Sequence, residues 1–180
     1  MRIIGGKYRG KKLFSPESAN VRPTSDRARE ALFNILRSKL GSFDGRKLID
    51  VFCGTGAFAL EALSQGFAKV AAVDVDVRAV RKNAALFVAE KANIQIINCD
   101  AARLSGVPEY DVLFMDAPYN KGLSEPALRA AASVLKPNAL CLIEVQKDEQ
   151  LKLPEHYEML QERCYGLAKV VIARFAGAES

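Results

Sequence analysis

Short apolar segments alternate with segments of helical spacing along most of this chain. The apolar segments are residues 47–52, 68–73, 94–97, 111–115 and 139–145. Strands that are almost wholly apolar are buried on both faces, as in a parallel sheet that has helices on each side. Two further apolar runs, 157–160 and 169–175, have no helix between them, so we expect an antiparallel hairpin there. The sequence therefore predicts an α/β fold with a mostly parallel seven-stranded sheet and an antiparallel C-terminal hairpin.

Helical spacing of apolar side chains predicts the elements between these strands. We expect a helix that Thr24 or Ser25 caps and that runs to residue 40, and further helices over residues 57–65, 76–91 and 124–135. Residues 136–138 contain a proline and are expected to end the last of them. Because no stretch has the composition of a linker, residues 1–180 are interpreted as a single domain.

Acidic residues and glycines stand where the predicted strands end, which is where such sheets bind ligands. Asp50 precedes a strand-to-helix loop with Gly54 and Gly56, whose small size lets a ligand approach the backbone. Asp74 ends the next strand and can accept hydrogen bonds from ribose hydroxyls; Asp100 follows the third and can accept one from an adenine amine. The loop has no basic residue for a pyrophosphate, so the set favours S-adenosylmethionine over NAD. Each aspartate could instead cap a helix.

The segment Asp116-Ala117-Pro118-Tyr119 follows the fourth strand. The Asp116 carboxylate and the carbonyl of Ala117 can accept hydrogen bonds from an exocyclic amine, and the ring of Tyr119 can stack on a base. Such contacts would direct the lone pair of the nitrogen toward a methyl group on sulfonium. The pattern therefore predicts methyl transfer to a nucleobase, although a simple turn after a strand would also contain such a proline.

Positive charge is concentrated near the N-terminus. The net charge is +5, but residues 1–47 hold 12 Lys and Arg against 4 Asp and Glu, a balance of +8. The basic residues that precede the first acid are Arg2, Lys7, Arg9, Lys11 and Lys12. Apolar residues and glycines among them predict that residues 1–20 fold as a basic β-hairpin arm. A basic arm on a nearly neutral body favours a polyanionic partner such as nucleic acid.

Other classes of protein lack support in the sequence. The four cysteines lie far apart and His156 is the only histidine, so we expect no metal site and no Ser-His-Asp triad. No apolar run approaches the ~20 residues that a membrane span needs. The N-terminus turns polar at once, which is unlike a secretory signal. We therefore expect a cytoplasmic protein with reduced thiols and no membrane partner.

Several of these segments together resemble the class I, Rossmann-like, S-adenosylmethionine-dependent amino-methyltransferases. They are Asp50–Gly56, Glu61–Ser64, Asp74 and Asp116–Tyr119. The segments Gly5–Gly10 and Arg22–Asn34 narrow the resemblance to the RsmD family, bacterial enzymes that methylate the N2 amine of one guanine in small-subunit ribosomal RNA. The resemblance extends to Tyr165-Gly166 before the last strand.

The resemblance implies a role for each candidate residue. Asp50, Gly54 and Gly56 would line the methionine end of the cofactor, with Asp74 at its ribose and Asp100 at its adenine. Asp116 and Tyr119 would hold the guanine, and Pro118 would stiffen their loop. Arg22 would lie near the cofactor or the RNA, and the arm would bind RNA phosphates, so that binding weakens with salt. The partner would be the ribosomal RNA or the small subunit particle, and we expect a monomer.

The sequence departs from the family pattern at Ala117, where proline is usual. The carbonyl oxygen is retained, and the loss of rigidity typically costs ~0.4–1 kcal/mol. Three alternatives stay open: an adenine-N6 methyltransferase acting on DNA or RNA, an NAD oxidoreductase, and a non-catalytic RNA-binding protein of ribosome assembly. Nothing in residues 116–119 distinguishes guanine N2 from adenine N6.

Overall fold

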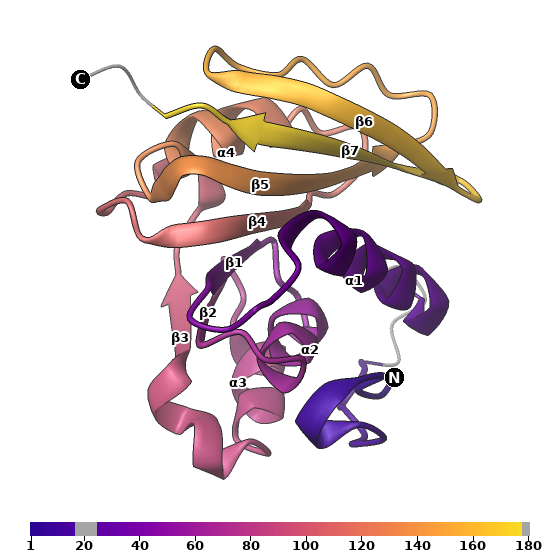
Figure 1. Cartoon of the computed structure of the whole chain (residues 1–180), viewed down its shortest axis with the longest axis vertical. Helices are drawn as coiled ribbons and strands as arrows, with labels where there is room; N and C mark the ends of the chain where they lie inside the picture. Colours follow the sequence, from indigo (N-terminus) through magenta and orange to yellow (C-terminus); the bar gives the residue numbers. More distant parts are fainter. Residues whose placement is uncertain (17–24, 178–180) are drawn as a thin grey trace.

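A single mixed sheet forms the centre of the molecule. The computed structural model describes residues 1–16 and 25–177. The strands are β1 (Lys47–Val51), β2 (Lys69–Asp74), β3 (Ile94–Asn98), β4 (Tyr110–Asp116), β5 (Leu135–Gln146), β6 (Tyr157–Tyr165) and β7 (Ala168–Phe175). Their order across the sheet is β3-β2-β1-β4-β5-β7-β6 (Figure 1). The strands β1 to β5 are parallel to one another, while β7 pairs antiparallel with both β5 and β6. The predicted fold class is confirmed.

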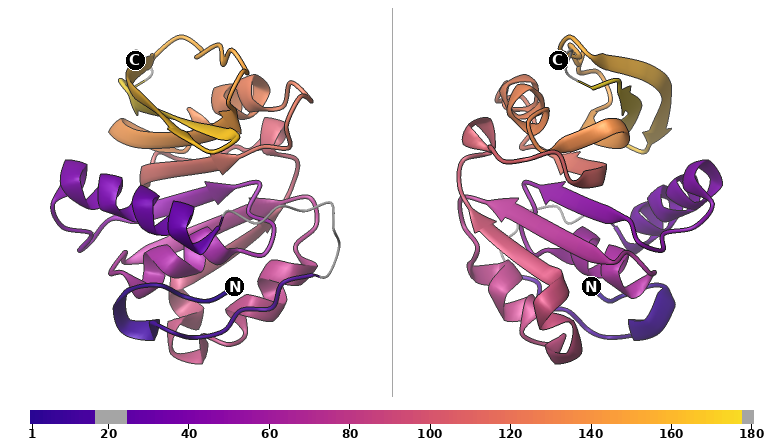
Figure 2. Two further views of the ribbon diagram at one scale, coloured as in Figure 1. Left: turned by 90° about the vertical axis from the view of Figure 1, so that its right-hand side faces the viewer. Right: turned by 60° about the vertical axis from the view of Figure 1, so that its left-hand side comes forward.

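Helices cover both faces of this sheet. The α-helices are α1 (Asp26–Leu40), α2 (Ala57–Ser64), α3 (Arg78–Ala84) and α4 (Ser124–Ala131), and the 3-10 helices are η1 (Gly6–Tyr8), η2 (Val88–Asn93) and η3 (Ala101–Arg103). The helices α1, α2 and α3 pack in one core cluster, and α4 and η3 pack in another on the opposite face. Figure 2 shows α1 and α4 on opposite sides of the strands. None of the described helices is both long and apolar enough to cross a membrane.

Alternation along each strand divides the side chains between these two cores. In β1, Leu48 belongs to the cluster under α1 and α2, whereas Ile49 and Val51 belong to the cluster under α4. Successive strand residues point to opposite faces, so a strand that is covered on both sides must be apolar throughout. On the first face Phe58 stacks on Phe114 with 3.6 Å between ring centroids.

The helix predicted over residues 76–91 is shorter than the apolar spacing indicates. The helix α3 ends at Ala84, and the chain tightens into 3-10 geometry before β3. Leu86 and Phe87 donate backbone hydrogen bonds to carbonyls three residues back, at 3.0 and 2.9 Å. This turn places the buried ring of Phe87 against the arm, 5.0 Å from the ring of Tyr8. A contact between segments distant in sequence thus overrides the local helical pattern.

The second difference concerns the start of β5. The helix α4 ends at Ala131, and Ser124 is its first residue, with no side-chain cap at its N-terminus. Residues 136–138 do not end a helix but interrupt the pairing of β5 with β4: Leu135 faces Tyr110, and the register then shifts between Tyr110 and Val112. Asn138 has a φ of 68°, and Pro137 has no N–H to donate. The irregularity therefore lies inside the strand.

The N-terminal arm, residues 1–14, folds back on itself and packs on the body. Its antiparallel pairing consists of one isolated bridge between Arg2 and Lys12, with η1 at the tip, instead of two regular strands. Ile3 and Leu13 are buried in a small cluster with Leu60 and Phe87. The arm thus runs across α2 and η2.

Candidate functional site

A cleft of about 890 Å³ opens at the carboxyl ends of β1, β2, β4 and β5. Its size falls within the range of sites for nucleoside-sized ligands. The predicted site residues that line it are Asp50, Gly54, Asp74, Asp100, Asp116, Ala117, Pro118 and Tyr119. Parallel strands bring residues that are far apart in sequence to this edge, as the sequence predicts.

Asp50 is the most deeply buried acid of the cleft, with 1% of its surface exposed. Its Oδ2 accepts a hydrogen bond from the Ala59 amide at 3.2 Å, which fixes the carboxylate above the start of α2. Among the described residues, 1–16 and 25–177, its Oδ1 has no hydrogen-bond partner. Burial raises the pKa of Asp50 well above its usual range, and the charges of Asp116 and Asp74 raise it further. A cationic group of a ligand would give Oδ1 the partner that it lacks.

Asp74 is tied to the glycine loop. Its Oδ2 accepts from the backbone N–H of Gly54 at 2.8 Å, and its Oδ1 accepts from that of Asp76 at 3.1 Å. A carboxylate has about four lone-pair sites, so both oxygens can accept further bonds from a ligand diol. The neighbouring Asp76 accepts from the Arg78 amide at 3.1 Å, although the N-cap position of α3 is Val77 and Asp76 is therefore not the predicted cap. The guanidinium of Arg78 lowers the pKa of Asp76 to about 2.

Gly56 does not line the cleft. Its φ is +75°, and a Cβ at this position would lie 2.4 Å from Cγ2 of Val80. The glycine therefore lets α2 approach α3 closely. Its predicted place at the methionine end of a cofactor stays a prediction that the cleft lining does not support.

Asp100 lies at the cleft and also caps a helix. It lines the cleft, and its Oδ1 accepts from the Ala102 amide at 2.9 Å, so it caps η3. The bond fixes the carboxylate at the end of β3, where it can still accept from a ligand amine.

Asp116, Ala117 and Tyr119 extend from β4 beside Glu144 of β5. Asp116 is the register partner of Glu144, and the Tyr119 hydroxyl donates to Glu144 Oε1 at 3.2 Å. Ala117 is buried, with 4% exposure, so packing holds the backbone where a second proline would otherwise stiffen it. Sequence reasoning missed Glu144. It is an acid near the end of an apolar run, as Asp74 and Asp116 are, and this signal could have identified it.

A buried ion pair joins the cleft to the arm, and sequence reasoning also missed its role. Arg29 lines the cleft and is 1% exposed, and its Nε lies 3.5 Å from Oε2 of the fully buried Glu61. Glu61 also accepts the backbone N–H groups of Ile4 and Gly5, both at 2.8 Å. The guanidinium of Arg29 donates to the carbonyl of Arg2. The pair therefore anchors the arm beside the mouth of the cleft.

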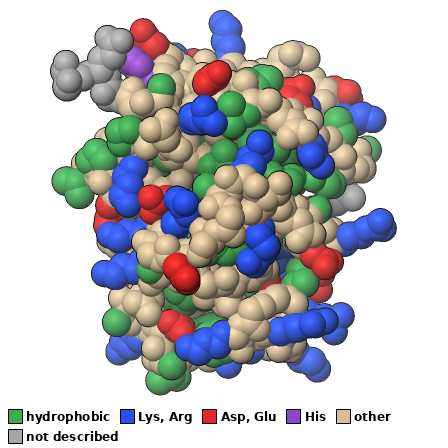
Figure 3. Space-filling model, in the orientation of Figure 1, with side chains coloured by type: hydrophobic (Ala, Val, Ile, Leu, Met, Phe, Trp, Pro, Cys, Tyr) green, Lys and Arg blue, Asp and Glu red, His purple; other side chains and the backbone are tan. Residues whose placement is uncertain are grey.

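The basic residues of the arm differ in their surroundings. Lys7 forms an ion pair with Glu90 at 2.7 Å, and Lys11 lies over the rings of Tyr8 and Phe87. Arg2 is exposed and lies 3.9 Å from Asp26. Within residues 1–16 and 25–177, Arg9 and Lys12 form no ion pair, and both are exposed. Arg22 lies outside the described residues. Figure 3 shows Lys and Arg side chains projecting from the lower part of the molecule, where Figure 1 places the arm.

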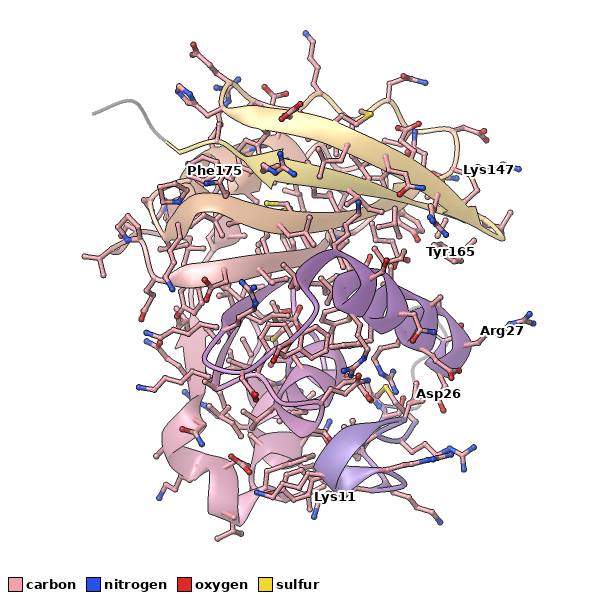
Figure 4. The ribbon with its side chains drawn as sticks, in the orientation of Figure 1. Lys11, Asp26, Arg27, Lys147, Tyr165 and Phe175 are labelled. Atoms are coloured by element: carbon pink, nitrogen blue, oxygen red, sulfur yellow. The ribbon has the colours of Figure 1, made fainter. Side chains whose placement is uncertain are left out.

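The turn between β6 and β7 overhangs the mouth of the cleft. Tyr165 pairs with Ala168, so Gly166 and Leu167 alone form the turn, and Gly166 has a φ of +60°. Tyr165 and Leu167 line the cleft, although Leu167 is 65% exposed. In Figure 4 Tyr165 lies above Asp26 and Arg27, which are the first residues of α1. In the described part of the chain no group of three or more potential metal-ligating side chains is present.

Comparisons with known proteins agree with this geometry. The family described as conserved hypothetical protein 95 matches residues 1–174. Ribosomal RNA small subunit methyltransferase D of Haemophilus influenzae is 33% identical over 93% of this chain and 90% of its own. The protein of the same name from Escherichia coli strain K12 is 34% identical over 92% and 85%. The structure of Escherichia coli yhhF, a proposed methyltransferase, superposes with a TM-score of 0.82 at 26% identity and covers 99% of both chains.

Proposed function

Because this chain belongs to the family described as conserved hypothetical protein 95, with relatives named ribosomal RNA small subunit methyltransferase D, we propose that it methylates the N2 amine of a guanine in small-subunit ribosomal RNA. The methyl donor would be S-adenosylmethionine. The resemblance to the RsmD family that the sequence motifs indicate is confirmed. The finer assignment of base and atom rests on the residues of the cleft.

The observation that carries the proposal is the buried Oδ1 of Asp50, which finds no partner in the described part of the chain and lies in a cleft of nucleoside size. The ammonium group of S-adenosylmethionine would supply a charged donor to it. Asp74, which the Gly54 amide holds in place, would accept from the ribose hydroxyls, and Asp100 would accept from the adenine amine. The donor set thus fits the cofactor from its amino acid end to its base.

The target amine would be held at the end of β4. The Asp116 carboxylate and the Ala117 carbonyl would accept hydrogen bonds from its two N–H groups, while the Tyr119 ring stacks on the base. When bound, S-adenosylmethionine supplies an electrophilic methyl group. The nitrogen would take this methyl group as the sulfur leaves, and Asp116 would stabilise the positive charge that develops on the nitrogen. The amine then loses a proton to Asp116 or to water, and the rest of the catalysis is positioning.

The arm would contact RNA phosphates chiefly through Arg9 and Lys12, which are exposed and lack ion-pair partners in the described part of the chain. Lys7 and Lys11 already contact Glu90 and aromatic rings. Residues 1–180 would form one methyltransferase domain that acts as a monomer. Its basic arm would comprise residues 1–20. A guanine that is paired in the RNA would have to leave its stack to reach the cleft.

A methyl-transfer assay with labelled S-adenosylmethionine tests the proposal. The substrates are small ribosomal subunits from cells that lack the enzyme, the naked ribosomal RNA, and duplex DNA, and mass spectrometry identifies the modified nucleoside. We expect N2-methylguanosine in RNA. N6-methyladenine would contradict the base assignment but keep the reaction type, and a protein that binds RNA but no cofactor would contradict the enzymatic assignment.

A further inference from the structure

Glu144 stands beside the target-binding segment at a position that the motif does not include. It lies in β5, is 8% exposed and lines the cleft. Its register partner across the parallel pair is Asp116. Neighbouring strands lie about 4.8 Å apart, so the two carboxylates start from adjacent points of one sheet edge. The cleft therefore offers two acidic side chains where the base would enter.

The Tyr119 hydroxyl links Glu144 to the base-stacking position. Its bond to Glu144 Oε1, at 3.2 Å, holds the carboxylate at the edge of the ring. A carboxylate has about four lone-pair sites, so it can accept from a ligand donor in addition to its existing contacts. A base that stacks on the ring face would bring its hydrogen-bonding edge toward the same carboxylates.

Guanine and adenine present different hydrogen-bonding groups to a pair of neighbouring carboxylates. Beside its N2 amine guanine has the N1–H, a second donor, whereas beside its N6 amine adenine has N1 with a lone pair. Two adjacent carboxylates can each accept from guanine. With adenine, one carboxylate would face a lone pair, which is a repulsive contact of the kind that enforces specificity.

We propose that Glu144 selects guanine by accepting a hydrogen bond from its N1–H, while Asp116 and the Ala117 carbonyl hold the N2 amine. The inference deepens the proposed function and rests on it. It assigns the choice between guanine N2 and adenine N6 to a residue outside residues 116–119. Glu144 is then a specificity-determining residue, and the Tyr119 contact positions it.

The test compares Glu144→Gln with Tyr119→Phe. The substrates are two small-subunit RNAs that differ only in guanine or adenine at the position that the methyl-transfer assay identifies. The wild type is expected to prefer guanine by at least about a thousandfold. Glu144→Gln should narrow this ratio by about tenfold to a hundredfold, because its amide can donate to N1 of adenine. Tyr119→Phe should slow transfer and narrow the ratio less than Glu144→Gln does, because the carboxylate is retained and only its positioning bond is lost. Glu109→Gln, at the opposite end of β4, is the matched control and should change neither.

A purely positioning role for Glu144 predicts a different result: both variants would slow transfer and neither would change the ratio. That outcome overturns the inference and leaves the proposed function standing, whereas a wild type that methylates adenine overturns the proposed function itself. Titration with GMP and AMP in the presence of S-adenosylmethionine covers the case of an inactive variant. A preference for GMP that Glu144→Gln loses supports the inference, and an unchanged preference contradicts it. Unaltered thermal unfolding and cofactor affinity show that the variant folds.

Discussion

The strand-end cleft and the N-terminal arm are two neighbouring regions that are built by different kinds of contact. The cleft gathers Asp50, Asp74 and Asp116 because parallel strands end together, and backbone amides of the adjoining strand-to-helix segment bond Asp50 and Asp74. The arm is held by side chains of distant elements: Glu61 accepts two of its amides, and Asn83 bonds the backbone of Phe14. Topology creates the first region, and buried polar contacts create the second.

Substitutions in the two regions should therefore affect different properties: methyl transfer for the cleft, and the free energy of unfolding for the arm. Removing an acid from the cleft should weaken or abolish ligand binding or methyl transfer without unfolding the protein, because these carboxylates line the cleft. Removing an acid that holds the arm should lower the stability of the fold, since it leaves buried donors without acceptors.

The largest expected effect is that of Asp116→Ala on transfer. We expect the variant to lose methyl transfer entirely, because the acceptor for the developing positive charge is gone, while cofactor affinity stays within about twofold. Single-turnover transfer and calorimetric titration with S-adenosylmethionine measure the two quantities. Equal loss of transfer and of affinity would mean that Asp116 holds the cofactor instead of the base.

Glu61→Ala should have the largest effect on stability. It leaves the buried guanidinium of Arg29 and two arm amides without their acceptor, and breaking a buried pair in this way costs about 3–5 kcal/mol. Denaturant unfolding measures the loss, and faster proteolysis within the arm locates it. Glu30→Ala, an exposed acid of α1, is the control and should have little effect. An arm that resists protease in Glu61→Ala would contradict this role of the acid.

Asp50→Asn tests the cleft through pH. Because burial raises the pKa of Asp50, the folded protein keeps this proton to a higher pH than the unfolded chain does. The contribution of Asp50 to stability is therefore complete below the unfolded pKa, near 4, and declines as the pH rises through the raised folded pKa. Without cofactor, Asp50→Asn should lose less stability than the wild type between pH 5 and pH 8.

The same variant should bind S-adenosylmethionine about tenfold or more weakly, because a carboxylate–ammonium bond is replaced by a neutral one. Wild-type affinity should rise with pH as Asp50 loses its proton. Unfolding curves and titrations at both pH values measure these effects. A wild-type affinity that falls with pH would contradict the assignment of Asp50 to the ammonium group.

The sheet and most of the cleft could be predicted from the sequence, because apolar runs locate strands and the ends of parallel strands coincide. Glu144 was missed although it follows the same rule. The structural roles of Glu61 and Asn83 could not be predicted, because their partners are backbone groups of the arm, 56 to 69 residues away. The helix over 76–91 was too long for the same reason: the contact of Phe87 with the arm is invisible to local periodicity.

The smallest expected effects concern the cations of the arm. Arg9→Ala and Lys12→Ala should each reduce the slope of log affinity against log salt for RNA by about 1, since each removes a phosphate contact. Lys7→Ala should reduce it less, because its ammonium group already pairs with Glu90. Filter binding at several salt concentrations measures the slopes. Equal slopes for Lys7→Ala and Arg9→Ala would show that the ion pair opens when RNA binds.

The turn between β6 and β7 also affects how the cleft mouth meets a large partner. Only Gly166 and Leu167 form it, and the pairing of Tyr165 with Ala168 fixes both of its ends. A side chain on so short a turn has almost no backbone freedom left to lose when a surface closes on it. Contact at Leu167 therefore carries little of the conformational entropy cost that ordering a longer loop would add to association.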